Sequence, residues 1–332
     1  MSGELSLAVV IATYNRGTLL VRLLEDLAAQ RAAGVFEVVI VDDGSEPPAR
    51  PLCEARRWPF PLRFIEQANT GQARARHRGI SATAADIVVI TDDDMALPPD
   101  FIAEHRALHA AGAEVVLGLI RPAEDLAQKP LFERFHAAQL AAFATAQRHT
   151  DAPPPGAALC TGNVSLRRAR YLAVGGFDDT LLRSEDRDLG IRLEKAGAKL
   201  VFSERAYCLH HSDHTDRVVW LQRAFNYGIS DYHIGRKHAD DKRHDPWIFW
   251  LLVNPVSRPL LLAAVGSDAL GRALSQAAQR TSEWLDDRGL ERLAIKGTTL
   301  VYGLEYFRGV RAAYASTPAA LRGWVRFLRK RS

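Results

Sequence analysis

Short apolar runs alternate with amphipathic segments along the first two thirds of the chain. Residues 5–12 are apolar except for one serine, as in a strand buried on both faces of a sheet. Residues 37–41 and 86–91 repeat this pattern. After the first strand, leucines recur at helical spacing and predict one buried helical face, formed by Leu19, Leu20, Leu23, Leu24 and Leu27. The alternation predicts an α/β fold with a doubly wound, mostly parallel sheet flanked by helices.

Weaker patterns extend this prediction. A short strand is expected near residues 62–65, a helix over 71–82 and a strand over 114–119. A helix over 184–197 precedes another strand near 199–202. Beyond about residue 215 the chain reads as helical and rich in aromatic residues, so a helical C-terminal extension is expected.

Acidic turns directly follow two of the predicted strands. Asp92, Asp93 and Asp94 follow one, and the pair Asp42-Asp43 follows another. The carboxyl ends of parallel strands share one edge of a sheet, where ligands bind in such folds. Three adjacent carboxylates repel one another, which favours a divalent cation held by oxygen ligands. The alternatives are a solvated turn for the triplet and a helix cap or Asx-turn for Asp42.

Bulk composition narrows the class of protein. The net charge of +4 over 332 residues is too small to predict binding to nucleic acid. Three scattered cysteines without a CxxC pair argue against a disulfide framework or a zinc ribbon and favour a reducing compartment. We find neither a signal-peptide pattern nor an apolar run of about 18 residues. We therefore expect a cytoplasmic protein without a simple transmembrane helix.

Seven segments occur in a characteristic order: VVIATYNR, VDDGS, NTGQARARHRG, TDDDMALPPDF, GNVSLRR, GGFDD and LRSEDRDLGIRL. Over residues 5–235 this order resembles family 2 glycosyltransferases. The resemblance implies a glycosyltransferase A-type fold. It also implies inverting, metal-dependent transfer of a sugar from a nucleotide-diphosphate donor, with UDP preferred, to a hydroxyl acceptor. It divides the chain into a nucleotide-sugar half (1–115), an acceptor and base half (116–235) and a helical extension (236–332).

The resemblance also assigns roles to residues at the donor site. The assigned nucleotide-sugar residues are Ala12, Tyr14, Asp43, Arg76, Asp92 and Asp93. Within this set, Asp43 would accept a ring N–H of uracil, and Arg76 would reach the diphosphate while Arg74 and Arg78 stay solvated. His77 departs from the family pattern, which often has asparagine there.

For the metal, the resemblance makes Asp94 the direct ligand of Mg²⁺ or Mn²⁺. Asp92 would face the ribose or reach the metal through water. His211, or else His210, would complete the site, because adjacent residues of an extended chain point to opposite sides. A zinc site formed by HHxxH is the alternative, but the chain lacks the cysteines or HExxH spacing that would support it.

The catalytic base is expected on the helix over 184–197. Helical spacing places Leu189, Leu193 and Ala196 on the buried face, and points Asp188 and Lys195 toward solvent. Glu185 and Asp186 both flank the buried face, so geometry does not separate them. The resemblance favours Asp186. The alternative is that these acids only stabilise the helix N-terminus.

Two segments in the last third of the chain help to predict the mode of transfer and the kind of acceptor. WLQRAFNYG replaces the QxxRW motif of processive relatives, which predicts non-processive transfer. Residues 319–331 predict a basic amphipathic helix whose apolar face carries Leu321, Trp324, Val325 and Leu328, with Arg322, Arg326, Arg329 and Lys330 opposite. Such a helix suits peripheral contact with the inner face of the plasma membrane, and a glycan or lipid-linked acceptor. The alternative is a surface helix docked on its own protein.

Two other functions are compatible with the fold. A nucleotidyltransferase also pairs an α/β sheet with a metal and a diphosphate, but the TYNRG turn lacks its usual Gly-rich phosphate loop. A non-catalytic nucleotide-sugar-binding subunit of a membrane assembly would not need the acidic pairs 92/94 and 185/186.

Overall fold

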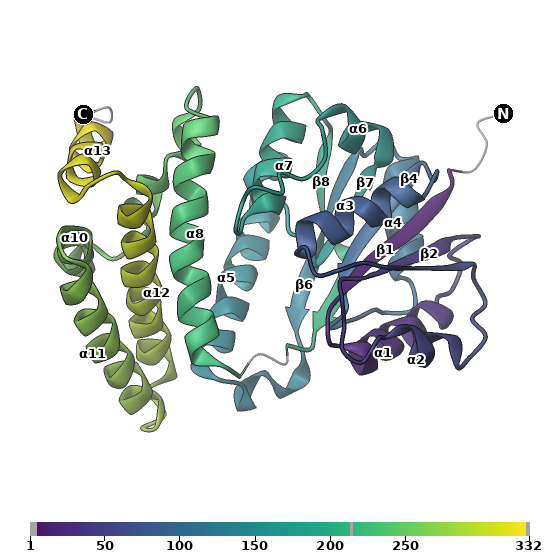
Figure 1. The fold of residues 1–332 in the computed structure, drawn as a ribbon, viewed down its shortest axis with the longest axis horizontal. Helices are drawn as coiled ribbons and strands as arrows, with labels where there is room; N and C mark the ends of the chain where they lie inside the picture. The colour runs from purple at the N-terminus through teal and green to yellow at the C-terminus, as the bar shows by residue number, and fades with distance from the viewer. Residues whose placement is uncertain (1–4, 213–214, 330–332) are drawn as a thin grey trace. The chain divides into compact units, whose positions relative to one another are not determined.

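The computed structural model describes residues 5–212 and 215–329. The chain divides into two compact units, which Figure 1 shows as ribbons. Unit 1 comprises Met1–Glu124, Gln139–Asp179 and Glu185–Asp213. Unit 2 comprises Asp125–Ala138, Thr180–Ser184 and His214–Ser332.

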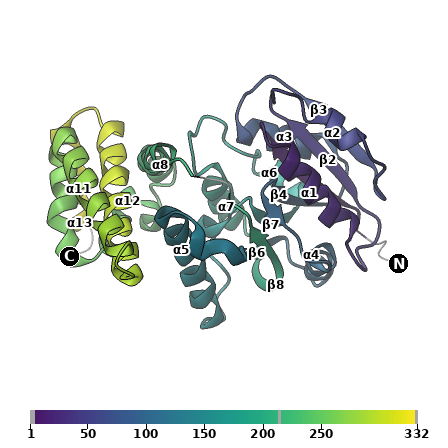
Figure 2. The ribbon, with the colours of Figure 1, turned by 90° about the horizontal axis from the view of Figure 1, so that it is seen from below.

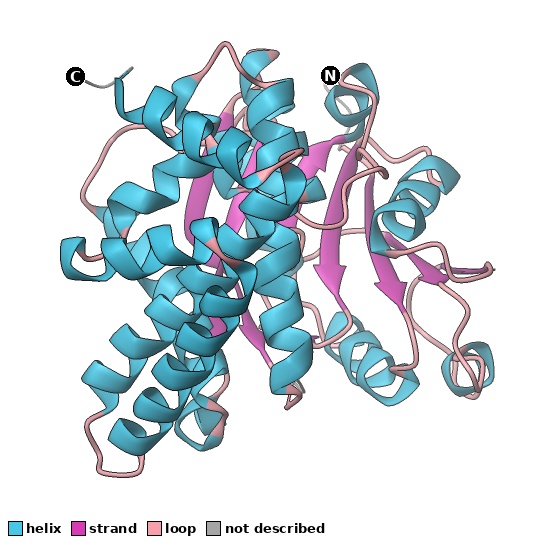
Figure 3. Ribbon diagram, turned by 60° about the vertical axis from the view of Figure 1, so that its left-hand side comes forward, coloured by secondary structure: helices cyan, strands magenta, loops and turns pink. Residues whose placement is uncertain are grey.

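Unit 1 is built on a mixed β-sheet (Figure 3). In the described residues the sheet has eight strands in the order β3-β2-β1-β4-β7-β6-β8-β5. Their bounds are β1 Leu7–Thr13, β2 Glu37–Asp42, β3 Leu62–Glu66, β4 Ile87–Asp92, β5 Met95–Ala96, β6 Val115–Pro122, β7 Asn163–Arg167 and β8 Leu200–His210. Strands β1 to β4 are parallel, whereas β7 lies antiparallel between β4 and β6. The predicted α/β architecture is confirmed.

Helices cover both faces of this sheet. They are α1 Gly17–Ala28, α2 Arg50–Glu54, α3 Gln72–Ala82, α4 Phe101–Ala110, α6 Arg168–Ala173 and α7 Glu185–Lys195. Val9 and Ile11 of β1 pack on one side with the leucines of α1, and Val10 packs on the other side in a separate core cluster. This two-sided burial explains the continuous apolar run of β1. Helix α1 begins at Gly17 and buries Leu20, Leu23, Leu24 and Leu27, while Leu19 is only half-buried.

Unit 2 is helical. Its helices are α8 Arg217–Lys237, α9 Phe249–Leu252, α10 Arg258–Gly266, α11 Asp268–Asp286, α12 Glu291–Ala313 and α13 Thr317–Arg329. Helix α5, Leu131–Arg148, begins among the residues of unit 2 and ends among those of unit 1. Among the short 3-10 turns, η2 Gly156–Ala158 lies in unit 1, and the others are η1 Glu124–Gln128, η3 Lys242–His244, η4 Pro246–Ile248 and η5 Pro255–Ser257. Figure 2 shows α11, α12 and α13 as neighbours.

Glycines let the long helices of unit 2 approach closely. A Cβ on Gly309 of α12 would lie 1.9 Å from the carbonyl oxygen of Phe225 in α8, and one on Gly228 of α8 would lie 2.0 Å from that of Tyr306. Only hydrogen fits at such contacts. Trp247 and Phe307, with ring centroids 5.4 Å apart, are part of the core that these helices enclose.

Helix α13 is amphipathic, and its inward face agrees with the predicted one only at Leu321 and Trp324, which pack against the core of unit 2. Ala320 and Phe327 are buried in the core of unit 2, and Trp324 packs against Trp250 with ring centroids 5.4 Å apart. Val325 and Leu328 remain 37% and 36% exposed. The helix is therefore docked on its own protein, and Lys330 lies outside the described residues. Within the described parts of the chain, no helix combines the length and apolar character needed to cross a bilayer.

Candidate functional site

The acidic turns of unit 1 meet at one edge of the sheet, as their positions after parallel strands predict. Thr13 at the end of β1 is in register with Asp42 of β2, and Ala12 is in register with Asp92 of β4. Ala12 is half-buried in this row, whereas the Tyr14 side chain is 48% exposed just beyond it.

Asp42 and Asp43 have different partners. Asp42 accepts backbone N–H groups of Ser45 and Ala49, each at 2.9 Å, which is the turn-forming alternative expected for this residue. Asp43 accepts the backbone N–H of Thr70 at 2.9 Å and of Gly71 at 2.8 Å. Asp43 therefore fixes the segment that leads into α3, and both carboxylates are buried.

Arg16 and Thr13 were not predicted as site residues, yet both contact the aspartate triplet. Arg16 Nη1 lies 3.2 Å from Asp93 Oδ1 and 3.0 Å from Asp94 Oδ2. The Thr13 hydroxyl donates to Asp93 Oδ2 at 2.7 Å. Burial raises the pKa of Asp93 to about 7, although this hydrogen bond and the charge of Arg16 oppose the shift. Asp93 thus ties the turn after β1 to the end of β4.

Arg76 joins the strand edge to the helix that carries the predicted base. Its Nη2 lies 2.5 Å from Asp92 Oδ1, and its Nη1 lies 3.1 Å from Glu185 Oε1. Gln72 Nε2, one turn earlier on α3, donates to the same Glu185 oxygen at 2.6 Å. Arg76 is only 4% exposed and Glu185 is buried as well, whereas the Asp92 side chain is 34% exposed. The predicted diphosphate ligand is therefore bound to two carboxylates of its own chain.

The other arginines of α3 lie at the surface, as the two-residue spacing predicts. Arg74 pairs with Asp179 at 2.6 Å, and both side chains are about half exposed. Arg78 donates to the backbone carbonyl of Glu66 at 3.2 Å. Of the three, Arg76 alone is part of the bridge to Glu185.

Glu185 and Asp186 differ in their surroundings, which helical periodicity did not separate. Glu185 is buried and accepts side-chain donors from Gln72 and Arg76. Asp186 is half-buried, and its Oδ1 accepts the backbone N–H of Arg187 at 2.7 Å. Burial and then the charge of Glu185 raise the pKa of Asp186 to about 7, against the opposing effects of nearby N–H groups and Arg76.

The solvent-facing position predicted for Asp188 was wrong. Its side chain is fully buried, and its Oδ2 lies 2.8 Å from Arg192 Nε. Arg192 Nη1 also donates to the carbonyl of Val174 at 2.6 Å, so this ion pair fixes α7 against the segment that follows α6. Ala196, predicted to be buried, is exposed because α7 ends at Lys195. Lys195 is exposed as predicted.

The histidines at the end of β8 also differ from the favoured assignment. The His210 ring lies beside the triplet, with Nε2 3.6 Å from Asp94 Oδ2. His211 contacts the same residue through its backbone N–H, which donates to the Asp94 carbonyl at 2.9 Å, and it is exposed. His214 lies outside the described residues. The described residues contain no cluster of three His, Cys, Asp or Glu side chains placed to hold a metal ion.

The loop before β7 and Asn163, the first residue of that strand, have structural roles. The Oδ1 atom of this buried amide accepts a hydrogen bond from His105 Nε2 at 3.0 Å, and its Nδ2 donates to the carbonyls of Leu119 and Ala206. These bonds hold β7, β6 and β8 in register. The Thr91 hydroxyl donates to the Gly162 carbonyl at 3.2 Å, and this bond connects the loop to β4 beside the aspartates.

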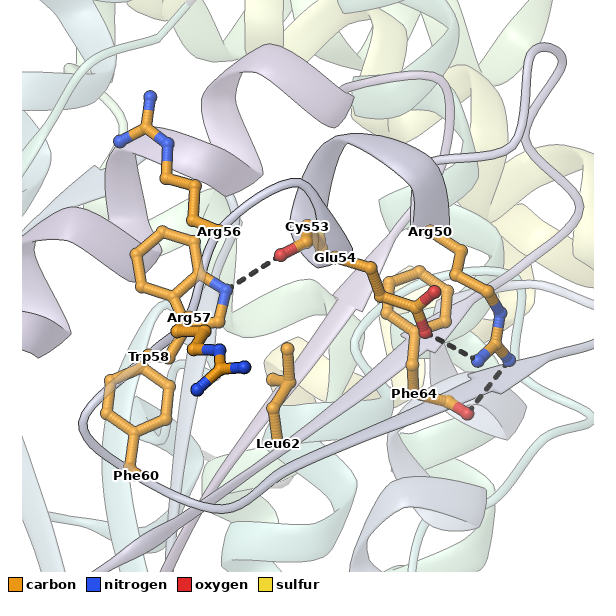
Figure 4. A pocket seen from close by; sticks show the side chains of 9 residues that line it. All are labelled: Arg50, Cys53, Glu54, Arg56, Arg57, Trp58, Phe60, Leu62 and Phe64. Atoms are coloured by element: carbon orange, nitrogen blue, oxygen red, sulfur yellow. Dashed lines mark hydrogen bonds and ion pairs between the residues drawn. The ribbon is translucent and has the colours of Figure 1, made fainter.

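A hollow of about 390 Å³ lies elsewhere on unit 1 (Figure 4). Its lining comes from α2, β3 and the segment between them, with Arg56, Arg57, Trp58 and Phe60 on one side. None of the aspartates described above lines it. It is therefore separate from the acidic edge.

Comparisons with known proteins agree with these features. Residues 8–171 match the model of glycosyl transferase family 2. The chain is 29% identical over 282 residues to validoxylamine A glucosyltransferase of Streptomyces hygroscopicus subsp. jinggangensis, covering 75% of this chain and 64% of that protein. It is 28% identical over 246 residues to pre-mycofactocin glycosyltransferase of Mycobacterium tuberculosis, covering 70% of this chain and 48% of that protein. It thus spans less than two thirds of these curated relatives.

Solved structures share the fold at low identity. Mannosyltransferase PcManGT from Pyrobaculum calidifontis, solved with GDP-Man and Mn²⁺, matches with a TM-score of 0.58 and 17% identity over 91% of this chain and 86% of that one. S. aureus TarS 1-349 matches with a TM-score of 0.51 and 16% identity over 93% and 91% of the two chains. The motif order, the mixed sheet and the match over residues 8–171 agree, and these residues form a glycosyl transferase family 2 domain.

Proposed function

We propose that the acidic edge of unit 1 transfers a sugar from a nucleotide-diphosphate sugar to an acceptor hydroxyl with inversion at the anomeric carbon. The observation that carries this proposal is the Arg76 bridge. One buried guanidinium binds Asp92 at the strand edge and Glu185 at the start of α7, so the expected donor residues and the expected base belong to one site.

Asp186 is the proposed base. Glu185 is engaged by two side-chain donors, which leaves Asp186 as the less committed carboxylate of the pair. A pKa of about 7 suits a group that must take a proton near neutral pH. In the proposed reaction Asp186 takes the acceptor hydroxyl proton while the hydroxyl oxygen bonds to the anomeric carbon. The bond from that carbon to the diphosphate oxygen breaks, and the nucleoside diphosphate leaves with its electron pair.

Asp94 and His210 are the proposed ligands of a divalent metal, and Asp92, which is bound to Arg76, would reach the metal through water. Carboxylate oxygens and an imidazole nitrogen suit Mg²⁺ or Mn²⁺, and Asp94 Oδ2 and His210 Nε2 lie 3.6 Å apart. When bound, such an ion neutralises negative charge on the leaving diphosphate. Arg16, which binds Asp93 and Asp94, holds the turn that presents these carboxylates. Mn²⁺ accompanies GDP-Man in the related PcManGT structure, which supports the same class of cofactor here.

The donor and acceptor are proposed more broadly. The family resemblance favours a UDP-sugar whose uracil ring lies near Asp43 and Tyr14. The structurally similar PcManGT, in contrast, was solved with GDP-Man. A glycan or lipid-linked hydroxyl compound is the proposed acceptor. Because the QxxRW motif is missing from WLQRAFNYG, transfer is proposed to be non-processive.

A donor screen tests this function. Thermal shift is measured with UDP- and GDP-sugars in Mn²⁺, Mg²⁺ or EDTA, because a ligand that binds the folded state raises the melting temperature. We expect one nucleotide sugar to stabilise the protein only when a divalent ion is present. Asp92→Asn should abolish this shift, while Asp179→Asn, at an exposed acid, should retain it. Failure of every nucleotide sugar to bind the wild type would reject the proposal.

Hydrolysis of the bound donor separates an enzyme from a binding subunit. Release of nucleoside diphosphate by the wild type, lost in Asp186→Asn with donor affinity retained, is expected of the enzyme. Equal release by both would refute the assignment of the base. Binding without any release would favour the non-catalytic subunit.

A further inference from the structure

Unit 2 carries an exposed, mostly apolar tip whose single charged residue is Arg258. It consists of residues 252–260, between the end of α9 and the first turn of α10. Leu252 is 74% exposed, Val256 84% and Leu260 38%, and both Pro255 and Pro259 are exposed. Exposed apolar residues scattered singly are ordinary, but a contiguous group of them indicates a binding surface.

Contacts on both sides of the tip hold it in this exposed position. Buried Trp250, Val253 and Leu261 anchor the tip on both sides in the core of unit 2. Asn254 caps η5 by accepting the backbone N–H of Val256 at 3.0 Å. Arg258 donates to the carbonyl of Leu251 at 3.3 Å and closes the turn. The anchors hold the tip in one conformation, with Leu252 and Val256 turned outward.

The tip lies beside helix α13, whose charged residues are all arginines. Helix α10 contacts α13 (Figure 1), and Trp250 packs on Trp324 of that helix. The outer side of α13 presents exposed Arg322, Arg326 and Arg329. No acidic residue occurs in the sequence over residues 246–266 or 306–332. Apolar side chains next to acid-free basic ones complement a surface with an apolar interior and anionic headgroups.

We propose that residues 252–260 and the arginines of α13 bind an anionic lipid bilayer at its interface. Leu252, Val256 and Leu260 enter the boundary between headgroups and acyl chains, and the arginines bind the headgroups. This surface differs from the one predicted from sequence, because Leu321 and Trp324 of the predicted apolar face pack against the core of unit 2. The proposal is independent of the reaction at the acidic edge.

Vesicle flotation of the full chain tests the proposal. Wild type should bind vesicles containing phosphatidylglycerol and bind pure phosphatidylcholine weakly. Leu252→Ser/Val256→Ser should weaken binding by at least about tenfold, since each side chain loses the transfer free energy of a buried aliphatic group. Val35→Ser is the matched control, because Val35 in unit 1 is also 84% exposed, and it should bind like wild type.

A second pair of substitutions tests the contribution of the α13 arginines to binding. Arg322→Gln/Arg326→Gln should weaken binding about fivefold per arginine, and added salt should remove this difference. Arg56→Gln/Arg57→Gln, at exposed arginines of unit 1, is the control and should change little. Circular dichroism melting confirms that each variant is folded.

Insertion is measured directly with Val256→Trp. Its fluorescence should be quenched by brominated acyl chains, and that of Val35→Trp should not. The proposal fails if wild type does not bind anionic vesicles, or if the tip variant binds as wild type does. It also fails if light scattering shows that the tip mediates a dimer that Leu252→Ser/Val256→Ser dissociates, because a second copy would then be the occupant.

Discussion

Arg76→Gln is expected to destabilise unit 1 strongly. Arg76 is 4% exposed and pairs with two carboxylates, one of which, Glu185, is itself 3% exposed. Removing the guanidinium leaves a buried negative charge without its partner, which typically costs about 3–5 kcal/mol. At about 2–4 °C per kcal/mol, the melting temperature should fall by on the order of 10 °C.

The assay is urea unfolding of metal-free protein at pH 7.5, followed by tryptophan fluorescence. Arg74→Gln is the matched control on the same helix, because the exposed Arg74–Asp179 pair is worth at most about 1 kcal/mol. The double variant Arg76→Gln/Glu185→Gln should recover part of the loss, since it removes the unpaired charge as well. If Arg76→Gln and Arg74→Gln unfold at the same urea concentration, the argument that Arg76 supports a buried bridge is wrong.

Three further predictions follow from other parts of the structure. Burial raises the pKa of Asp186 from the ordinary 3.8 to about 7 in the folded protein, so folding binds a proton between these values and stability falls as pH rises through them. Asp186→Asn should therefore unfold at higher urea than wild type at pH 8, and wild-type transfer should rise with pH through about 7 in a pH–rate profile. His210→Ala should weaken Mn²⁺ binding in calorimetry by about 10–100-fold, whereas a comparable loss in His211→Ala with His210→Ala unaffected would contradict the side-chain placement. Gly309→Ala should cost about 1–3 kcal/mol or more in urea unfolding, because its Cβ would lie 1.9 Å from a carbonyl oxygen of α8, while Gly266→Ala, with nothing within 4 Å, should lose much less.

The sheet core was predictable because its signal is local. The apolar runs that form β1, β2 and β4 are buried on both faces, so nearly every residue in them is hydrophobic. The acidic turns at their carboxyl ends then follow from parallel pairing. Strand β7 was not predicted, because its place between β4 and β6 depends on antiparallel pairing with residues far away in the sequence.

Sequence alone fixed the family, the architecture of the sheet and the convergence of the acidic turns, since these depend on hydrophobic period and on residue order. Only the tertiary structure decided which charged side chains pair with one another. Arg76 binds Asp92 and Glu185, Asp188 is buried against Arg192, and the His210 ring lies beside Asp94. The period of a helix or strand predicts on which face of the element a charged side chain lies. The pKa and the ion pairs of that side chain depend on the atoms packed against it, and these atoms come from distant parts of the chain.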